Sequence, residues 1–166
     1  MFFSAAEREE RIVQYERGPL RIRDALAVVP DEAVRWRPRP ERWSVHEVVC
    51  HCADSEMNGA ARIRYLVAQK EPTILGYDQD EWARVFNYHA LPLEPALRTI
   101  EAVRASTTLL LRTLPEEAWR KEGQHSESGR YTAEDWLKSY AEHLEKHSQQ
   151  IDRTLESWRA EQTQPG

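Results

Sequence analysis

The sequence has few cysteines and no long hydrophobic run. Cys50 and Cys52 are the only two cysteines among 166 residues, and a single residue separates them, which is too tight for an ordinary disulfide. The chain therefore suits a reducing compartment, and we expect a cytoplasmic location. No stretch reaches the roughly 18 consecutive apolar residues of a membrane span. The opening residues, MFFSAAEREE, also lack the basic start and apolar core of a secretory signal peptide, so we expect no membrane association.

An excess of basic residues is also missing. The chain has 23 Lys and Arg against 28 Asp and Glu, a formal net charge of −5. Proteins that bind nucleic acid normally carry a basic face that displaces counterions from phosphates. The one basic stretch, VRWRPRPERW at 34–43, is interpreted as a solvated loop with its charges outward. We therefore predict that the protein does not bind nucleic acid.

Helical periodicity dominates the sequence, and strand alternation is nearly absent, which predicts an all-α chain. The length favours one domain over residues 1–166, with a frayed tail over 160–166. Ser44 with Glu47 and Thr132 with Asp135 are predicted caps at two helix starts. The expected long helices cover 4–29, 44–70, 93–114 and 132–159.

The connections between these helices indicate how they are arranged. The motif RGP at 17–19 predicts a kink or break in the first helix. Residues 71–94 form a long connection with a short helix near 78–88, and GQHSESGR at 123–130 is expected to be a loop. Four long helices with one long crossover connection predict a four-helix bundle.

Two histidines, His143 and His147, lie four residues apart in the last predicted helix. Such residues lie about 40° apart around an α-helix, so the two rings share a face, one turn apart. That face adjoins the apolar stripe of the helix, formed by Trp136, Tyr140, Leu144, Ile151 and Trp158. The spacing alone leaves two interpretations open: half of a metal site, or two half-buried histidines that are hydrogen-bonded to their neighbours.

A metal site needs a third ligand, because zinc and similar ions usually take at least three protein ligands. In the helix predicted over 44–70, His51 lies on the flank of the apolar arc, about 60° from Val48, whereas His46 points to the opposite side. His51 is therefore the candidate partner of His143 and His147. The arc itself consists of Val45, Val48, Cys52, Ile63 and Leu66, and we expect Cys52 to be a small reduced core residue.

The segment RWSVHEVVCHCADSE at 42–56, followed by HLEKHSQQI at 143–151, resembles the DinB-like (DinB/YfiT) superfamily of metalloenzymes. The matching pattern is Trp43–Ser44 at a helix start, His51 before Ala53–Glu56, and the final pair His143 and His147. The resemblance covers nearly the whole chain. It implies a four-helix bundle with an up-down-down-up path, a metal centre of these three histidines, and a homodimer. One departure is Cys52, where such sequences commonly carry a bulky aliphatic residue.

Three histidines would leave an open coordination position, as catalytic zinc sites do. Zinc is the first choice of metal and nickel the second, because imidazole binds both. Such an ion can activate water or a thiol. The resemblance implies a small-molecule substrate and makes a low-molecular-weight thiol a candidate, since some relatives are thiol-dependent S-transferases or isomerases and others are labelled hydrolases. The competing interpretation is a non-catalytic, stress-related dimeric bundle in which the metal is structural.

Other polar residues near the predicted ligands are candidates for supporting roles. Asp54 is a candidate to accept a hydrogen bond from a ligand imidazole, and a solvent-exposed acid is the favoured alternative. Gln150 is a candidate for positioning water. His125, in the loop, is a candidate for the mouth of the site, and an ordinary surface histidine is the favoured alternative. Glu56 falls on the apolar arc, so its carboxylate should have a partner such as an arginine. No residue is assigned as a general base.

Overall fold

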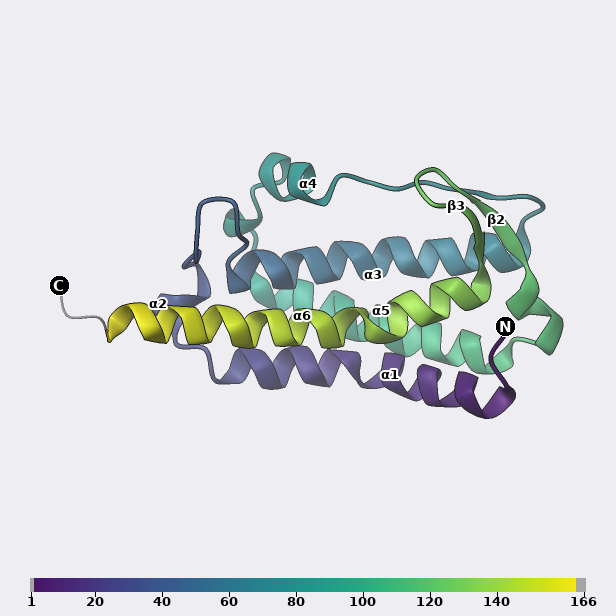
Figure 1. The fold of residues 1–166 in the computed structure, drawn as a ribbon, viewed down its shortest axis with the longest axis horizontal. Helices are drawn as coiled ribbons and strands as arrows, with labels where there is room; N and C mark the ends of the chain where they lie inside the picture. Colours follow the sequence, from purple (N-terminus) through teal and green to yellow (C-terminus); the bar gives the residue numbers. More distant parts are fainter. Residues whose placement is uncertain (1, 164–166) are drawn as a thin grey trace.

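Four long helices form a bundle in the computed structural model, which describes residues 2–163 (Figure 1). Helices α1 and α6 run in one direction, and α3 and α5 run in the other. Each of α1 and α3 contacts both α5 and α6. This is the predicted up-down-down-up path, and the parallel neighbours α3 and α5 require the long crossover between them. The bounds are α1 (Ala5–Ala27), α3 (Val45–Ala68), α5 (Leu93–Thr113) and α6 (Ala133–Gln162).

The two predicted caps fix the starts of the helices that carry the candidate histidines. At α3, the Glu47 amide donates to Ser44 Oγ at 3.2 Å, and the Ser44 amide donates to the Glu47 carboxylate at 3.0 Å. Thr132 and Asp135 form the same reciprocal pair at the start of α6. Such caps satisfy amide groups that have no partner inside the helix. The sequence therefore predicted where both helices begin.

The sequence predicted a kink or a break at the RGP motif, and helix α1 continues across it as one helix, so no break occurs there. Pro19 has no amide hydrogen to donate to the carbonyl of Tyr15. The guanidinium of Arg104, on α5, donates to that carbonyl instead. Gly18 allows this approach, because a Cβ there would lie 2.5 Å from Arg104 Nη1. A hydrogen bond from another helix thus replaces the one that proline removes.

Short elements occupy the connections between the long helices. The strands of a small sheet are β1 (Thr73–Ile74), β2 (Glu122–His125) and β3 (Gly129–Thr132), with β1 parallel to β2 and β2 antiparallel to β3. This sheet corrects the expected loop at 123–130. The short helices are α2 (Asp31–Val34), α4 (Gln79–Val85), η1 (Tyr88–Ala90) and η2 (Glu116–Arg120). Of these, α4 and η1 account for the short helix predicted in the crossover.

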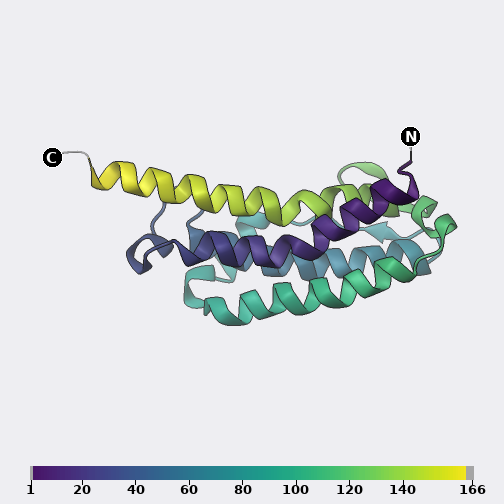
Figure 2. The same ribbon diagram turned by 90° about the horizontal axis from the view of Figure 1, so that it is seen from below.

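Figure 2 shows the long helices of the bundle from below. The described core has two larger apolar clusters, one toward each end of the bundle, and a small third one of Cys50, Ala83 and Tyr88. The cluster toward the sheet contains Tyr15, Ile63 and Trp136, and the other contains Val48, Ile100 and Leu144. Cys52 is fully buried and free, as predicted for a small core residue. None of the helices within residues 2–163 combines the length and the hydrophobicity needed to cross a membrane.

The C-terminal helix is longer than the sequence predicted. Residues 160–162, expected to fray, are helical and close α6. The predicted frayed tail also includes residues 164–166, which lie outside the described part of the chain.

Candidate metal centre

The structure brings together the three histidines selected from the sequence. His51 comes from α3, and His143 and His147 come from consecutive turns of α6. One nitrogen from each ring lies within 4.8 Å of the others. The Nε2 atoms of His143 and His147 are 3.2 Å apart. Two nitrogens bound to one tetrahedral zinc ion, each at the usual bond length, would be about 3.3 Å apart. The α6 pair therefore already has the spacing that chelation requires.

His51 is the buried member of this cluster. Its side chain is 1% exposed, and neither of its ring nitrogens has a hydrogen-bond partner within the described residues. A buried polar group without a partner is costly and calls for an explanation. The rings of His147 and Trp43 lie 4.8 and 4.7 Å from that of His51, centroid to centroid. A cation shared with His143 and His147 would satisfy the ring, so the donor set fits a metal ion.

Burial keeps the imidazoles of His51 and His147 neutral, which is the form that binds metals. Loss of hydration on burial, followed by the nearby rings of His147 and His143, lowers the pKa of His51 to about 2. Burial, followed by His143, likewise lowers the pKa of His147 to about 4. Both rings are therefore unprotonated near neutral pH, with a lone pair on each to donate.

Gln150 orients the ring of His147. Its Oε1 atom lies 2.9 Å from His147 Nδ1 and accepts the hydrogen from that nitrogen. The hydrogen on Nδ1 leaves the Nε2 lone pair directed at the cluster. Ligand histidines usually have such a partner on the nitrogen that faces away from the metal. Gln150 thus lies at the site, as the sequence indicated, but it contacts the ligand ring itself.

Glu56 lies beside Nδ1 of His143, as Gln150 lies beside Nδ1 of His147. Its Oε1 atom lies 3.4 Å from His143 Nδ1 and 2.6 Å from Arg104 Nη2, and its Oε2 atom accepts a bond from the Tyr15 hydroxyl at 3.3 Å. Burial by itself would raise the pKa of this carboxyl, but the charge of Arg104 and the bond from His143 outweigh it, and the net shift is downward. The carboxylate is therefore charged and aligned with His143, and Arg104 is the partner that its burial required.

The chain is similar to proteins of one known family. The model of the DinB superfamily matches residues 14–151. A protein of Oceanobacillus iheyensis, provisionally named a metal-dependent hydrolase, is 31% identical over 138 residues, which cover 83% of this chain and 80% of the relative. The chain belongs to the DinB superfamily.

Solved structures agree with the fold of this chain. The structure of YfiT from Bacillus subtilis, described as a "probable metal-dependent hydrolase with an unusual four-helix bundle topology", has a TM-score of 0.85 and 25% identity and covers 92% of this chain and 87% of its own. A mycothiol-dependent maleylpyruvate isomerase, at 14% identity and a TM-score of 0.69, shares the fold over 87% of this chain and 60% of its own length. The two comparisons place this DinB chain in a four-helix bundle architecture.

Two predicted supporting residues of the DinB chain lie elsewhere. Asp54 accepts a 2.6 Å bond from the Tyr88 hydroxyl and so fastens α3 to the crossover, with no hydrogen bond to a ligand imidazole among the described residues. The helical turn from His51 to Asp54 directs the carboxylate toward η1. His125 lies in β2, and its Nδ1 accepts the amides of Glu127 and Ser128 in the hairpin turn. It is not part of the histidine cluster.

Two contacts of the cluster, and the identity of the arginine that pairs with Glu56, were not predicted from the sequence. Ser55 Oγ lies 3.3 Å from His143 Nε2, one turn after His51 on the same helix face. Arg104 falls within the apolar stripe of α5, and a charge in such a stripe is the signal that was available. Trp43 was noted only as part of the helix start, yet its ring packs on His51.

Proposed function

We propose that this chain is a metal-dependent enzyme whose ion is held by His51, His143 and His147. The proposal is carried by the fully buried His51, whose two ring nitrogens have no partner among the described residues and which faces two half-buried imidazoles. In His143 and His147, the nitrogen that faces away from the cluster, Nδ1, is hydrogen-bonded. Three imidazoles suit zinc as the first choice of metal and nickel as the second. A structural zinc site would be expected to have four protein ligands, and three leave room for a substrate atom.

A divalent ion held by three neutral imidazoles acts as a Lewis acid and lowers the pKa of a water or thiol that it binds. Hydrolysis of a small molecule is the reaction we favour, because the relatives and YfiT carry the name of metal-dependent hydrolases. Transfer to or from a low-molecular-weight thiol is the alternative, supported by the shared fold of the mycothiol-dependent isomerase.

The residues of this chain have separate tasks in such a reaction. Glu56 and Gln150 hold the hydrogens on the Nδ1 atoms of His143 and His147, and so keep the two Nε2 lone pairs directed at one point. Ser55, 3.3 Å from His143 Nε2, can donate its hydroxyl hydrogen to an oxygen or sulfur atom that binds at that point. Trp43 covers His51 and restricts the access of bulk water to it.

One observation favours a second function, a non-catalytic dimeric bundle with a structural metal. Within residues 2–163, the only carboxylate hydrogen-bonded to the three rings is that of Glu56, and Arg104 already engages it, so it is a poor proton acceptor. Both proposals place the chain in the cytoplasm as a homodimer. Two free, buried cysteines support the reducing location.

Metal analysis of protein purified without a histidine tag tests both proposals. We expect about one ion per chain, with near-complete loss in His147→Ala. The matched control is His125→Ala, which removes a histidine outside the cluster and should keep the metal. Full metal content in His147→Ala would rule out the assignment. In cobalt-substituted protein, a change in the visible spectrum on adding thiols or small anions favours the enzyme, and an unresponsive spectrum favours the structural ion.

A further inference from the structure

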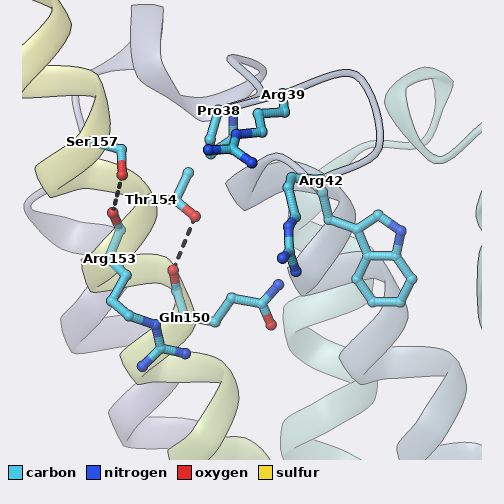
Figure 3. Close-up of a pocket in the computed structure, with 8 residues that line it drawn as sticks. Pro38, Arg39, Arg42, Gln150, Arg153, Thr154 and Ser157 are labelled. Carbon is cyan, nitrogen blue, oxygen red and sulfur yellow. Dashed lines mark hydrogen bonds between the residues drawn. The ribbon is translucent and has the colours of Figure 1, made fainter.

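A cavity of about 580 Å³ (Figure 3) is lined in part by Gln150, which is hydrogen-bonded to His147. It lies between two segments that are far apart in the sequence. One wall is the C-terminal half of α6, and the other is the connector that precedes α3. The lining residues are Pro38, Arg39, Arg42, Trp43, Gln150, Arg153, Thr154 and Ser157.

The lining of this cavity is basic, although the whole chain is acidic. Arg39, Arg42 and Arg153 line it, and no aspartate or glutamate does. None of the three arginines forms an ion pair with the described residues. Positive charges that share one space repel one another, and a bound anion relieves that repulsion. The basic stretch at 34–43 is thus exposed, as the sequence indicated, but two of its arginines face a cavity.

The two hydroxyl groups that line the cavity are already hydrogen-bonded within α6, so the arginines are the donors available to an anion. The Thr154 hydroxyl donates to the Gln150 carbonyl at 2.9 Å, and the Ser157 hydroxyl donates to the Arg153 carbonyl at 2.9 Å (Figure 3). A hydroxyl has a single hydrogen, so neither has one left for a ligand. Guanidinium groups, in contrast, present several hydrogens in a plane that matches carboxylate and phosphate oxygens.

Two lining residues connect the cavity to the histidine cluster. Gln150 is hydrogen-bonded to His147, and Trp43 packs on His51. A second cavity, of about 490 Å³, shares Arg42, Trp43 and Gln150 with the first, but Glu41, Asp80 and Glu127 also line it. Those carboxylates would repel an anion. Of these two cavities, the one lined by the three arginines is therefore the more favourable for a negatively charged group.

We propose that Arg39, Arg42 and Arg153 bind an oxyanion group, a carboxylate or a phosphate, of the small molecule on which the metal centre acts. This inference rests on the proposed function for its link to catalysis, but the binding site itself does not require a metal. Substrates would then be small organic acids or phosphate esters, with the anionic group in the arginine cavity and the reacting bond at the histidines.

Calorimetric titration at low ionic strength with inorganic phosphate and with malonate tests this site. Both probes carry the oxyanion, and the tighter one identifies the preferred group, while neutral malonamide should not bind. Arg42→Gln and Arg153→Gln should each weaken binding by about 10-fold or more, since each loses charge-assisted hydrogen bonds. Arg42→Lys, which keeps the charge but not the planar donor group, should fall in between. The matched control is Arg98→Gln, an exposed arginine of α5 that pairs with Glu94, with an expected change within about two-fold.

The proposal would be overturned if neither probe binds. It would also be overturned if Arg42→Gln and Arg153→Gln bind the probes as tightly as Arg98→Gln, which is the result expected if the anion binds to the metal alone. Circular dichroism confirms that each exposed substitution leaves the fold intact. Metal content is measured in the same samples. If the protein contains no metal but Arg42→Gln still binds the anionic probes more weakly, the proposed function is refuted and the anion site is supported. Failure of the proposed function can therefore be distinguished from failure of the anion site.

Discussion

Replacing Glu56 by glutamine tests the central ion pair of the bundle. Glu56 and Arg104 are 0% and 1% exposed, and their charged atoms are 2.6 Å apart. Glutamine keeps the shape but leaves the guanidinium buried without a counter-charge. Removal of one partner of a buried pair typically costs about 3–5 kcal/mol, because the remaining charge is uncompensated. We therefore expect Glu56→Gln to lower the free energy of unfolding by about that amount.

Urea unfolding of metal-free protein, followed by circular dichroism, measures this loss without a contribution from the ion. The matched control is Glu94→Gln. Glu94 also pairs with an arginine, Arg98 at 3.1 Å, but both side chains are at least half exposed. Exposed pairs contribute at most about 1 kcal/mol, so the control should change little. Loss of less than about 1 kcal/mol in Glu56→Gln would refute the view that this pair is desolvated and mutually dependent.

The same substitution should alter the dependence of stability on pH. The pKa of Glu56 is lowered in the folded chain from its ordinary value of 4.5, chiefly by Arg104 against the opposing effect of burial. A lowered folded pKa gives stability that is complete above the unfolded value and is lost as pH falls through the folded one. The difference in unfolding free energy between wild type and Glu56→Gln should therefore be constant above about pH 5 and shrink below about pH 4. A difference that grows on acidification would contradict the lowered pKa.

Three further substitutions test the close approach at Gly18, the cap of α3 and the group that orients His147. Gly18→Ala should cost about 1–3 kcal/mol, measured by urea unfolding, because its Cβ would lie 2.5 Å from Arg104 Nη1; an unchanged midpoint would show that the guanidinium has room. Ser44→Ala should cost about 1 kcal/mol in the same assay through loss of the α3 cap, unless another group takes over the amide. Gln150→Leu should weaken metal binding at least about 10-fold in a chelator competition, and equal affinity would remove it as the group that orients His147.

Much of the fold could be predicted because it depends on local and periodic signals. The caps at Ser44 and Thr132 set the starts of two helices, and the apolar arc around Val48 is buried as predicted, although the first turns of α3 are buried on every side. The small sheet could not be predicted, since its four-residue strands contain almost no apolar alternation. The pairing of β1 with β2 joins segments about fifty residues apart, and no local pattern specifies such a partner.

The three histidines could be selected for a similar reason: helical periodicity fixes which side chains face the bundle interior. His51, His143 and His147 need only the correct face and register to meet. The arginine cavity depends instead on the path of an irregular connector. Nothing in the spacing of Arg39 and Arg42 places them opposite Arg153, so the basic stretch is equally compatible with a solvated loop.

The RGP motif shows how a local anomaly in the sequence becomes part of the site. Pro19 leaves the Tyr15 carbonyl without its helical donor, and Gly18 leaves the space through which Arg104 reaches it. The same guanidinium holds the carboxylate of Glu56, which in turn lies against His143. An ordinary residue at position 19 would supply an amide donor to the Tyr15 carbonyl and so compete with Arg104 for it. Such a residue should therefore change the orientation of His143 on α6, through Arg104 and Glu56. For this reason the RGP motif contributes to the metal centre as well as to the fold.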